Sequence, residues 1–313
     1  MNNNVEKLIS KCKEDYKGGV FLSLKPRIDD LDTTVAHLYS AGGKMCYFNM
    51  PEGNGFNIWN KEYEKYSYGQ LDFVPGRGFG YLFSNFDNMI KTCDNRAHDE
   101  DNFKKGKVSG KTPVNHYERM RENMIAAYNS ELSEKLLAVI DMEYSVDKTK
   151  LGSKKIVKNP KADLICVTVE NGRIVFYVTE YKSTQNGFEV GLGEHYDDMS
   201  MYYNEIRIKE HLVKTLQDRL KYGLILCNED VKGIIRDLTV DGIDVKLLFL
   251  FSDAADFEST NSNALKRGYS EILKKSEADD VPVYYAYIGN IEKGCLKKTI
   301  LRKFECDGKF ELV

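Results

Sequence analysis

The sequence lacks the features of membrane and secreted proteins. None of its apolar runs approaches the roughly 20 residues that a transmembrane helix needs. The first residues, MNNNVEKLISKCKEDYKGG, contain no apolar signal core. The seven cysteines are scattered and form no CxxC pair, so neither a disulfide framework nor a cysteine zinc site is indicated. We therefore expect a reduced, cytoplasmic protein without a membrane partner.

Two further absences concern metal and nucleic-acid binding. The five histidines show no HExxH or HxH spacing, which removes the usual histidine signatures of zinc. The net charge of -3 at pH 7 argues against a protein with a strongly basic surface for nucleic acid.

The lysines are nevertheless unevenly distributed along the chain, because six of them fall in the segment from Lys148 to Lys161. This segment is either a solvated loop or a phosphate-contacting surface. The lysines that would form that surface are Lys154, Lys155, Lys158 and Lys161.

The organisation of the chain changes at a polar segment, residues 95–113. Residues 1–110 are irregular in pattern and are predicted to form an α+β region, either an extension or a small domain. Within it, residues 29–40 are predicted to be a helix. Residues 111–313 are more regular and are predicted to form an α/β domain with an α-β-β-β-α-β core and a β tail.

The predicted elements of the second region follow from its hydrophobic periodicity. In chain order they are a helix at 117–135, a strand at 136–146, a hairpin within 160–184, a helix at 194–220, strands at 224–227 and 245–251, a helix at 262–276 and three short strands in the tail.

The strongest local signal is Asn171-Gly172, which lies between two apolar segments. An Asn-Gly pair fits a type I′ turn, because both central residues of that turn need a positive φ. With these two residues in the turn, Glu170 pairs with Arg173. The same register places Asp163 opposite Glu180.

This register gives the hairpin one apolar face that ends in charged residues. The apolar positions are Ile165, Val167, Val169, Ile174, Phe176 and Val178. Asp163 and Glu180 complete the face, with their Cβ atoms about 5 Å apart. Lys182 projects from the same face, because side chains alternate along a strand. Two acids and a lysine at the end of a buried face cost free energy unless they have a ligand or a function.

More acids are expected near the same end of the sheet. Glu131 lies seven residues after Met124 and falls on the apolar stripe of the predicted helix 117–135. Asp141 and Glu143 alternate with apolar residues on the next strand. Oxygen ligands without a histidine or cysteine cluster favour Mg²⁺ or Mn²⁺ over zinc.

The pattern formed by Pro160, Asp163, Glu180 and Lys182 resembles the motif of the PD-(D/E)xK nuclease superfamily. The resemblance covers roughly residues 115–252. It departs from the usual motif because two residues separate the proline from the aspartate. It implies a restriction-endonuclease-like fold, with a central mixed sheet flanked by helices. It also implies Mg²⁺-dependent hydrolysis of a nucleic-acid phosphodiester, with DNA expected ahead of RNA, and it allows an oligomer such as a dimer.

The resemblance also implies residue roles. Asp163 and Glu180 correspond to the metal ligands, and Lys182 corresponds to the catalytic lysine. Glu131 would supply the further acid that family members often carry on the first helix. The accessory candidates are Glu143, His195 and Asp198.

Two functions stay open at this level. The first is a metal-dependent nuclease. The second is a non-catalytic protein of the same fold that binds nucleic acid or protein. Several aromatic residues precede residue 70. They could stack on bases, but the favoured interpretation is that they belong to the core and to strand surfaces. These residues are Tyr47, Trp59, Tyr63, Tyr66 and Tyr68.

Overall fold

A computed structural model of the chain describes most of its residues. The described residues are 2–14, 19–58, 78–98, 116–134, 136–150, 161–182, 192–252, 262–288 and 301–303, with the single residues 66, 71, 159 and 296. The chain forms two compact units, which are described separately. One comprises Met1–Arg27 and Asp32–Tyr128, and the other comprises Ile28–Leu31 and Asn129–Val313.

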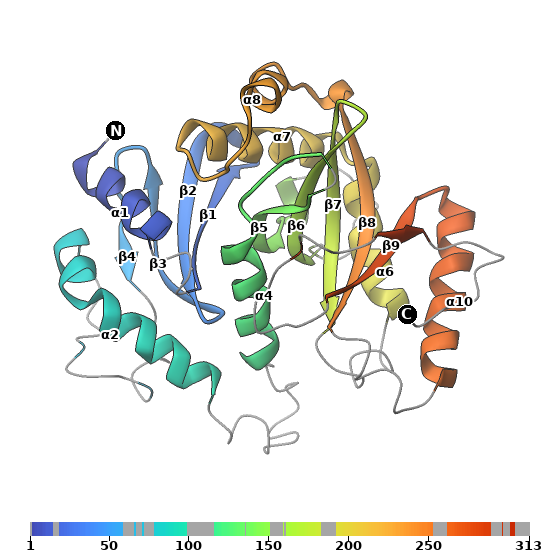
Figure 1. Cartoon of the computed structure of the whole chain (residues 1–313), viewed down its shortest axis with the longest axis horizontal. Helices are drawn as coiled ribbons and strands as arrows, with labels where there is room; N and C mark the ends of the chain where they lie inside the picture. The colour runs from blue at the N-terminus through green and yellow to red at the C-terminus, as the bar shows by residue number, and fades with distance from the viewer. Residues whose placement is uncertain are drawn as a thin grey trace. The chain divides into compact units, whose positions relative to one another are not determined.

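The N-terminal unit is built on a four-stranded sheet of order β1-β2-β3-β4 (Figure 1). Its elements are α1 (Asn3–Glu14), β1 (Val20–Arg27), β2 (Asp30–Ser40), β3 (Gly43–Met50), β4 (Asn57–Ile58), α2 (Phe79–Ala97) and α4 (His116–Tyr128). Strand β3 runs antiparallel to both β2 and β4. The helices α1 and α2 each bury an apolar face, as expected for amphipathic helices.

The prediction of a helix at residues 29–40 is wrong, because β2 occupies this segment. Thr33, Thr34 and Val35 are β-branched, and such residues favour a strand over a helix. Ala36 and Leu38 are buried, and His37 between them is less so, as on a strand with one covered face. The local β-branched composition therefore favours the strand that is observed here.

The second unit is built on a six-stranded mixed sheet of order β10-β9-β8-β7-β6-β5 (Figure 1). Its strands are β5 (Ala138–Ser145), β6 (Lys161–Glu170), β7 (Arg173–Lys182), β8 (Ile243–Ser252), β9 (Val283–Ile288) and β10 (Arg302–Lys303). Its helices are η3 (Lys148–Lys150), α6 (Leu192–Asn204), α7 (Ile206–Lys221), α8 (Glu229–Arg236), η4 (Val240–Gly242) and α10 (Ser262–Asp279). The meander β5-β6-β7 is antiparallel, and β8 and β9 continue the sheet in parallel with β7. The chain is thus α/β, as predicted.

The predicted helix 117–135 ends early, at Tyr128, and belongs to the N-terminal unit. The Asn129 carbonyl accepts a hydrogen bond from the Val139 backbone at 2.6 Å, and its side chain accepts one from Leu296 at 2.8 Å. These contacts hold residue 129 outside the helix. The division between the units therefore follows Tyr128, whereas the sequence suggested a break at residue 110.

Two other elements of the second unit differ from expectation. The predicted strand 224–227 contributes only an isolated bridge between Leu226 and Glu131. The predicted helix 194–220 is two helices, α6 and α7, which are separated at Glu205 by extended backbone. Helix α8 was not predicted, although Asn228 caps it by accepting a hydrogen bond from Val231 at 2.9 Å.

The hairpin register was predicted correctly along the described ladder. Pairing runs from Glu170 with Arg173 to Leu164 with Thr179. The turn residues Asn171 and Gly172 have φ values of 51° and 75°, as a type I′ turn requires. The six apolar residues of the predicted face all belong to one buried cluster, which also contains side chains of α6 and α7. Within the described residues, no helix is long and apolar enough to cross a membrane.

The turn can be tested by substitution. Gly172→Ala should lower the free energy of unfolding by about 1 kcal/mol, because an L-residue at positive φ is strained. No atom lies within 4 Å of a β carbon at this position, so the loss would come from the backbone alone. Gly233→Ala in α8 has equally open space and should gain about 0.5–1 kcal/mol from helix propensity. Urea unfolding measures both, and an undiminished stability of Gly172→Ala would contradict the turn.

Candidate functional site

The site begins where the backbone pairing of β6 and β7 ends. Beyond the pair Leu164 and Thr179, the Asp163 side chain takes the place of a backbone acceptor. Its Oδ2 accepts a hydrogen bond from the backbone N–H of Tyr181 at 2.8 Å. Tyr181 lies between Glu180 and Lys182. The two halves of the motif are therefore joined directly, through a contact that the sequence did not indicate.

Glu180 is buried and is surrounded by cationic and imidazole nitrogens. Only 4% of the Glu180 surface is exposed, and the value for Lys182 is 7%. Lys182 Nζ donates a hydrogen bond to Glu180 Oε1. His195 Nδ1 lies 2.8 Å from the same oxygen, and His195 Nε2 lies 3.3 Å from Lys182 Nζ. With its proton on Nδ1, His195 donates to Glu180 Oε1 and accepts from Lys182, so the three side chains form one hydrogen-bonded group.

The charge on Glu180 is stabilised by these two partners. Burial acts to raise the pKa of Glu180, because a carboxylate loses solvation in a protein interior. The hydrogen bond from His195 and the positive charge of Lys182 outweigh burial and bring the pKa below its usual value. Glu180 is therefore ionised at neutral pH, which is the state that a metal ligand or an electrostatic catalyst requires.

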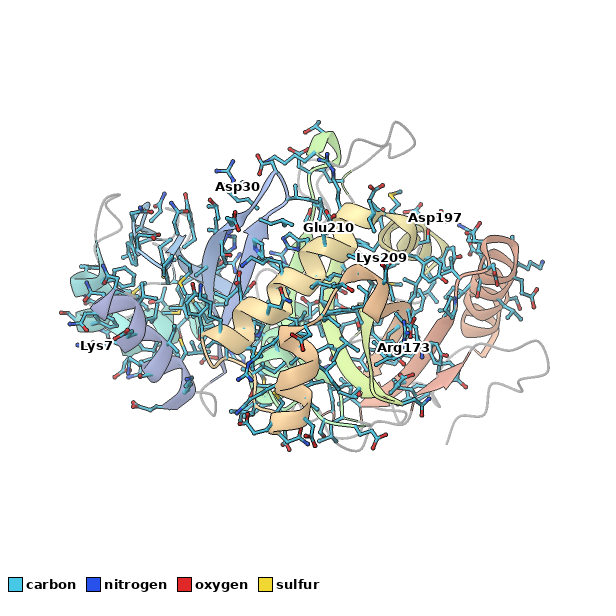
Figure 2. The ribbon with its side chains drawn as sticks, turned by 90° about the horizontal axis from the view of Figure 1, so that it is seen from above. Lys7, Asp30, Arg173, Asp197, Lys209 and Glu210 are labelled. Atoms are coloured by element: carbon cyan, nitrogen blue, oxygen red, sulfur yellow. The ribbon has the colours of Figure 1, made fainter. Side chains whose placement is uncertain are left out.

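Helix α6 carries His195 in its first turn, and α10 holds that turn in place. A β carbon at Gly268 of α10 would lie 2.5 Å from Leu192 Cδ1, so the two helices approach closely only because this residue is glycine. Lys275 of α10 donates hydrogen bonds to the Gly193 carbonyl at 3.1 Å and to Asp197 at 2.8 Å. Figure 2 labels Asp197, which lies on α6. The position of His195 thus depends on packing between two helices that are distant in sequence.

Glu143 lies on the strand next to Asp163. The pairs Met142 with Leu164 and Tyr144 with Ala162 flank it, so it occupies the rung of Asp163. Its φ is 48°, a conformation that costs a non-glycine residue roughly 1–2 kcal/mol. Strain of this kind concentrates at functional sites. Among the accessory acids, Glu143 is the one that the strand register brings to Asp163.

Asp198 and Glu131 have different surroundings. Tyr202 has a raised pKa, first because of its burial and then because of the nearby charges of Asp198 and Asp141. Asp198 therefore lies near the Tyr202 hydroxyl. Glu131 is exposed and lies beyond the end of α4. The prediction that a helix carries Glu131 on an apolar stripe is wrong, because the helix ends at Tyr128.

The predicted lysine surface is only partly described. Lys161 is exposed at the start of β6, two residues before Asp163. Lys154, Lys155, Lys158 and the motif residue Pro160 lie outside the described residues.

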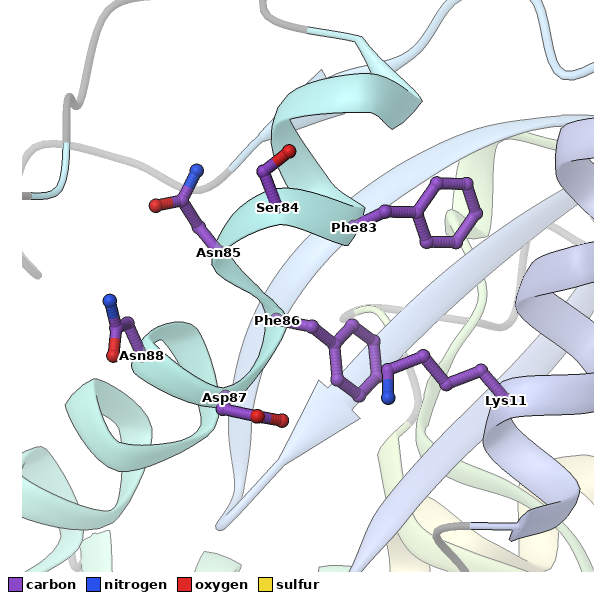
Figure 3. A pocket seen from close by; sticks show the side chains of 7 residues that line it. All are labelled: Lys11, Phe83, Ser84, Asn85, Phe86, Asp87 and Asn88. Atoms are coloured by element: carbon purple, nitrogen blue, oxygen red, sulfur yellow. The ribbon is translucent and has the colours of Figure 1, made fainter.

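No larger cluster of metal-ligating side chains is present in the part of the chain that the structure describes. Within it, no group of three or more histidine, cysteine, aspartate or glutamate residues gathers around one point. A pocket of about 190 Å³ lies instead in the N-terminal unit, lined by Lys11 of α1 and residues 83–88 of α2 (Figure 3). The end of the β6–β7 hairpin, where the buried Glu180 contacts both Lys182 and His195, is therefore the strongest chemical feature of the described residues.

Protein-family models, curated proteins and solved structures were compared with the chain, and none of them matches it. The functional assignment therefore rests on the residues and contacts of the site.

The buried pair of Glu180 and Lys182 should behave as one energetic unit. Lys182→Met alone should lower the free energy of unfolding by about 3 kcal/mol, because it leaves a buried carboxylate with less compensation. Combining it with Glu180→Gln should cost less than the sum of the single changes, with a coupling of about 1–3 kcal/mol. Urea unfolding of the four proteins measures this coupling. Strict additivity would show that the two side chains do not interact.

Proposed function

We propose that this chain is a divalent-metal-dependent nuclease with a restriction-endonuclease-like core. Its proposed substrate is a phosphodiester bond of nucleic acid, with DNA preferred over RNA. The observation that carries the proposal is the hydrogen bond from Tyr181 to Asp163, which joins the aspartate to the Glu180-x-Lys182 segment. The strand order supports it as well, because an antiparallel meander, a helical segment (α6 to α8) and a parallel strand follow one another, in line with the β-β-β-α-β part of the order that the resemblance implies.

The donor set fits a hard cation such as Mg²⁺ or Mn²⁺. Asp163 and Glu180 are carboxylates, and Glu180 is held in its ionised form. Both described contacts of Glu180 use Oε1, so Oε2 is the oxygen available to a ligand within the described part of the chain. A bound ion would polarise the scissile phosphate and lower the pKa of an attacking water.

The side chains around the carboxylates have separate tasks in this mechanism. Lys182 supplies a positive charge that stabilises the negative charge developing on the phosphate. The Tyr181 backbone N–H fixes the orientation of Asp163. His195 holds Glu180 in place and compensates part of its charge, so that Lys182 can turn toward a substrate without leaving Glu180 alone. His195 is therefore a positioning residue.

The nuclease assignment can be tested with purified protein and mixed DNA and RNA substrates. Cleavage should occur with Mg²⁺ or Mn²⁺ and stop with EDTA. Lys182→Met should reduce the cleavage rate by about 100-fold or more, because it removes a charge that stabilises the transition state. Circular dichroism checks that the variant is folded.

Lys246→Met is a matched control for this variant. Lys246 is also largely buried on a strand of the same sheet, and it donates to Glu170 at 2.6 Å. Its loss breaks a comparable ion pair at a different position and should leave cleavage unchanged. A Lys182→Met protein that cuts as fast as wild type, or cleavage that persists in EDTA, would overturn the proposal.

A second candidate function is a non-catalytic binding protein of the same fold. The observation that favours it is the contact of both Lys182 and His195 with Glu180 Oε1, which compensates the carboxylate without a metal. Nucleic-acid binding by wild-type protein without cleavage under any metal condition would select this function.

A further inference from the structure

One face of the N-terminal sheet carries aromatic and basic side chains. Strands β2 and β3 pair His37 with Tyr47. Their neighbours Ala36 and Phe48 are fully buried, so the alternation of the strands puts His37 and Tyr47 on the opposite face. Tyr47 is 39% exposed and is one of three large apolar side chains that are exposed among the described residues, with Ile206 and Leu226. Tyr47 therefore lies on the strand surface and not in the core.

The aromatic rings on this face form a connected group. The ring centroids of His37 and Tyr47 are 5.8 Å apart, and those of His37 and Tyr39 are 6.2 Å apart. His37 Nδ1 lies 3.3 Å from the Tyr39 hydroxyl. The Tyr47 hydroxyl accepts a hydrogen bond from Asn57 at 2.8 Å. Tyr39 is buried, and Tyr47 is the exposed ring of the group. The contacts hold the Tyr47 ring in place, so a ligand that stacks on it costs the protein little side-chain entropy.

Lysines add positive charge to the same face. Lys44 is exposed, and its Nζ lies 5.8 Å from the centroid of the Tyr47 ring. The pKa of His37 is well below its usual value, because of burial and then because of the charges of Lys25 and Lys44. The acids of β2, Asp30 and Asp32, fall on the other alternation of the strand. The face therefore combines aromatic rings with positive charge.

We propose that the face formed by Lys25, His37, Lys44 and Tyr47 is a stacking platform for single-stranded nucleic acid, with the buried Tyr39 in contact with His37. An unpaired base stacks on the exposed ring of Tyr47, and Lys44 and Lys25 contact the adjacent phosphates. The bases of a duplex are already stacked on each other and cannot lie on such a face, so single strands are the preferred ligand. The charge of the lysines is what selects a polyanion over an uncharged ligand.

This inference shares with the proposed function only the class of ligand. Binding on this face needs neither a metal nor Lys182, and a platform of this type tolerates many sequences. It would hold a strand whether or not the acid pair of the second unit cuts it.

The test is fluorescence anisotropy of the full chain with labelled oligothymidine and oligouridine in EDTA. The oligonucleotides should be about 20 nucleotides long, which exceeds the roughly 4–16 nucleotides that one single-strand binding domain covers. Tyr47→Ala should weaken binding by about 5- to 100-fold, as expected for the loss of one base–aromatic stack. Tyr47→Phe keeps the ring and should bind within about twofold of wild type, since only the hydroxyl is lost.

Two lysine variants form a matched pair in the same assay. Lys44→Ala should weaken binding and lower the salt dependence by about one unit of slope, because one phosphate contact is lost. Lys209→Ala is the control, because Lys209 of α7 also lies over a tyrosine ring, that of Tyr203 at 5.7 Å, but belongs to the other unit. Its binding should equal that of wild type. Figure 2 labels Lys209 on its helix.

Several results would overturn the platform. Wild-type protein that does not bind single strands, or that prefers duplex, would do so. Equal losses for Tyr47→Ala and Tyr47→Phe would assign the effect to the hydroxyl and its hydrogen bond with Asn57. If Tyr47→Ala does not fold, Tyr47→Leu replaces it, because leucine keeps apolar bulk on the strand without an aromatic face. Wild-type affinity of Tyr47→Leu for single strands would then overturn stacking. Lys182→Met should bind like wild type in EDTA, so a failure of the nuclease proposal would not be read as a failure of this one.

Discussion

The pairing of β6 with β7 determines where Asp163, Glu180 and Lys182 of the candidate site lie. Asn171 and Gly172 set the register, and the register assigns alternate residues to the face covered by α6 and α7. A slip of one residue would move Val178 and Phe176 to the opposite face of the sheet and turn Glu180 away from His195. The same pairing that buries the apolar face therefore also brings a glutamate and a lysine into a position where little solvent reaches them. One strand register therefore sets both the apolar core of the hairpin and the positions of the charged side chains at its end.

A buried carboxylate is tolerated here because its partners come from two directions. Lys182 follows it on the same strand, and His195 approaches from α6, whose first turn is held by α10. Replacing such a group of charges with apolar side chains is often neutral or favourable for stability, so a purely structural role gives little reason to keep it. Asp163, fixed to the backbone N–H of Tyr181, adds a second carboxylate to the same segment. A buried carboxylate with a perturbed pKa, such as Glu180, is typical of sites that bind a cation or act on a charged substrate.

The hairpin and its charged end could be predicted from the sequence because both depend on local signals, the Asn-Gly turn and the alternation of apolar residues. Thr33, Thr34 and Val35 also carried a local signal, for a strand, and the helix prediction at 29–40 neglected it. The residue at which α4 ends could not be predicted from local signals. It depends on hydrogen bonds of Asn129 with Val139 and with Leu296, which is remote in sequence. Glu131 was misplaced for that reason. The contact of Asp163 with Tyr181 and the positive φ of Glu143 likewise depend on how the strands meet, which no single segment encodes.

The central claim is that Asp163 and Glu180 form one cation site, and binding of the cation is its most direct test. Mn²⁺ titrated into the purified protein without nucleic acid can be followed by electron paramagnetic resonance, because the signal of the free ion is lost on binding. The account predicts one saturable site in the wild-type protein that is lost in both Asp163→Asn and Glu180→Gln, while Glu170→Gln at the far end of the hairpin keeps it. Mn²⁺ binding that survives both substitutions, or a folded wild-type protein that binds no Mn²⁺, would contradict it.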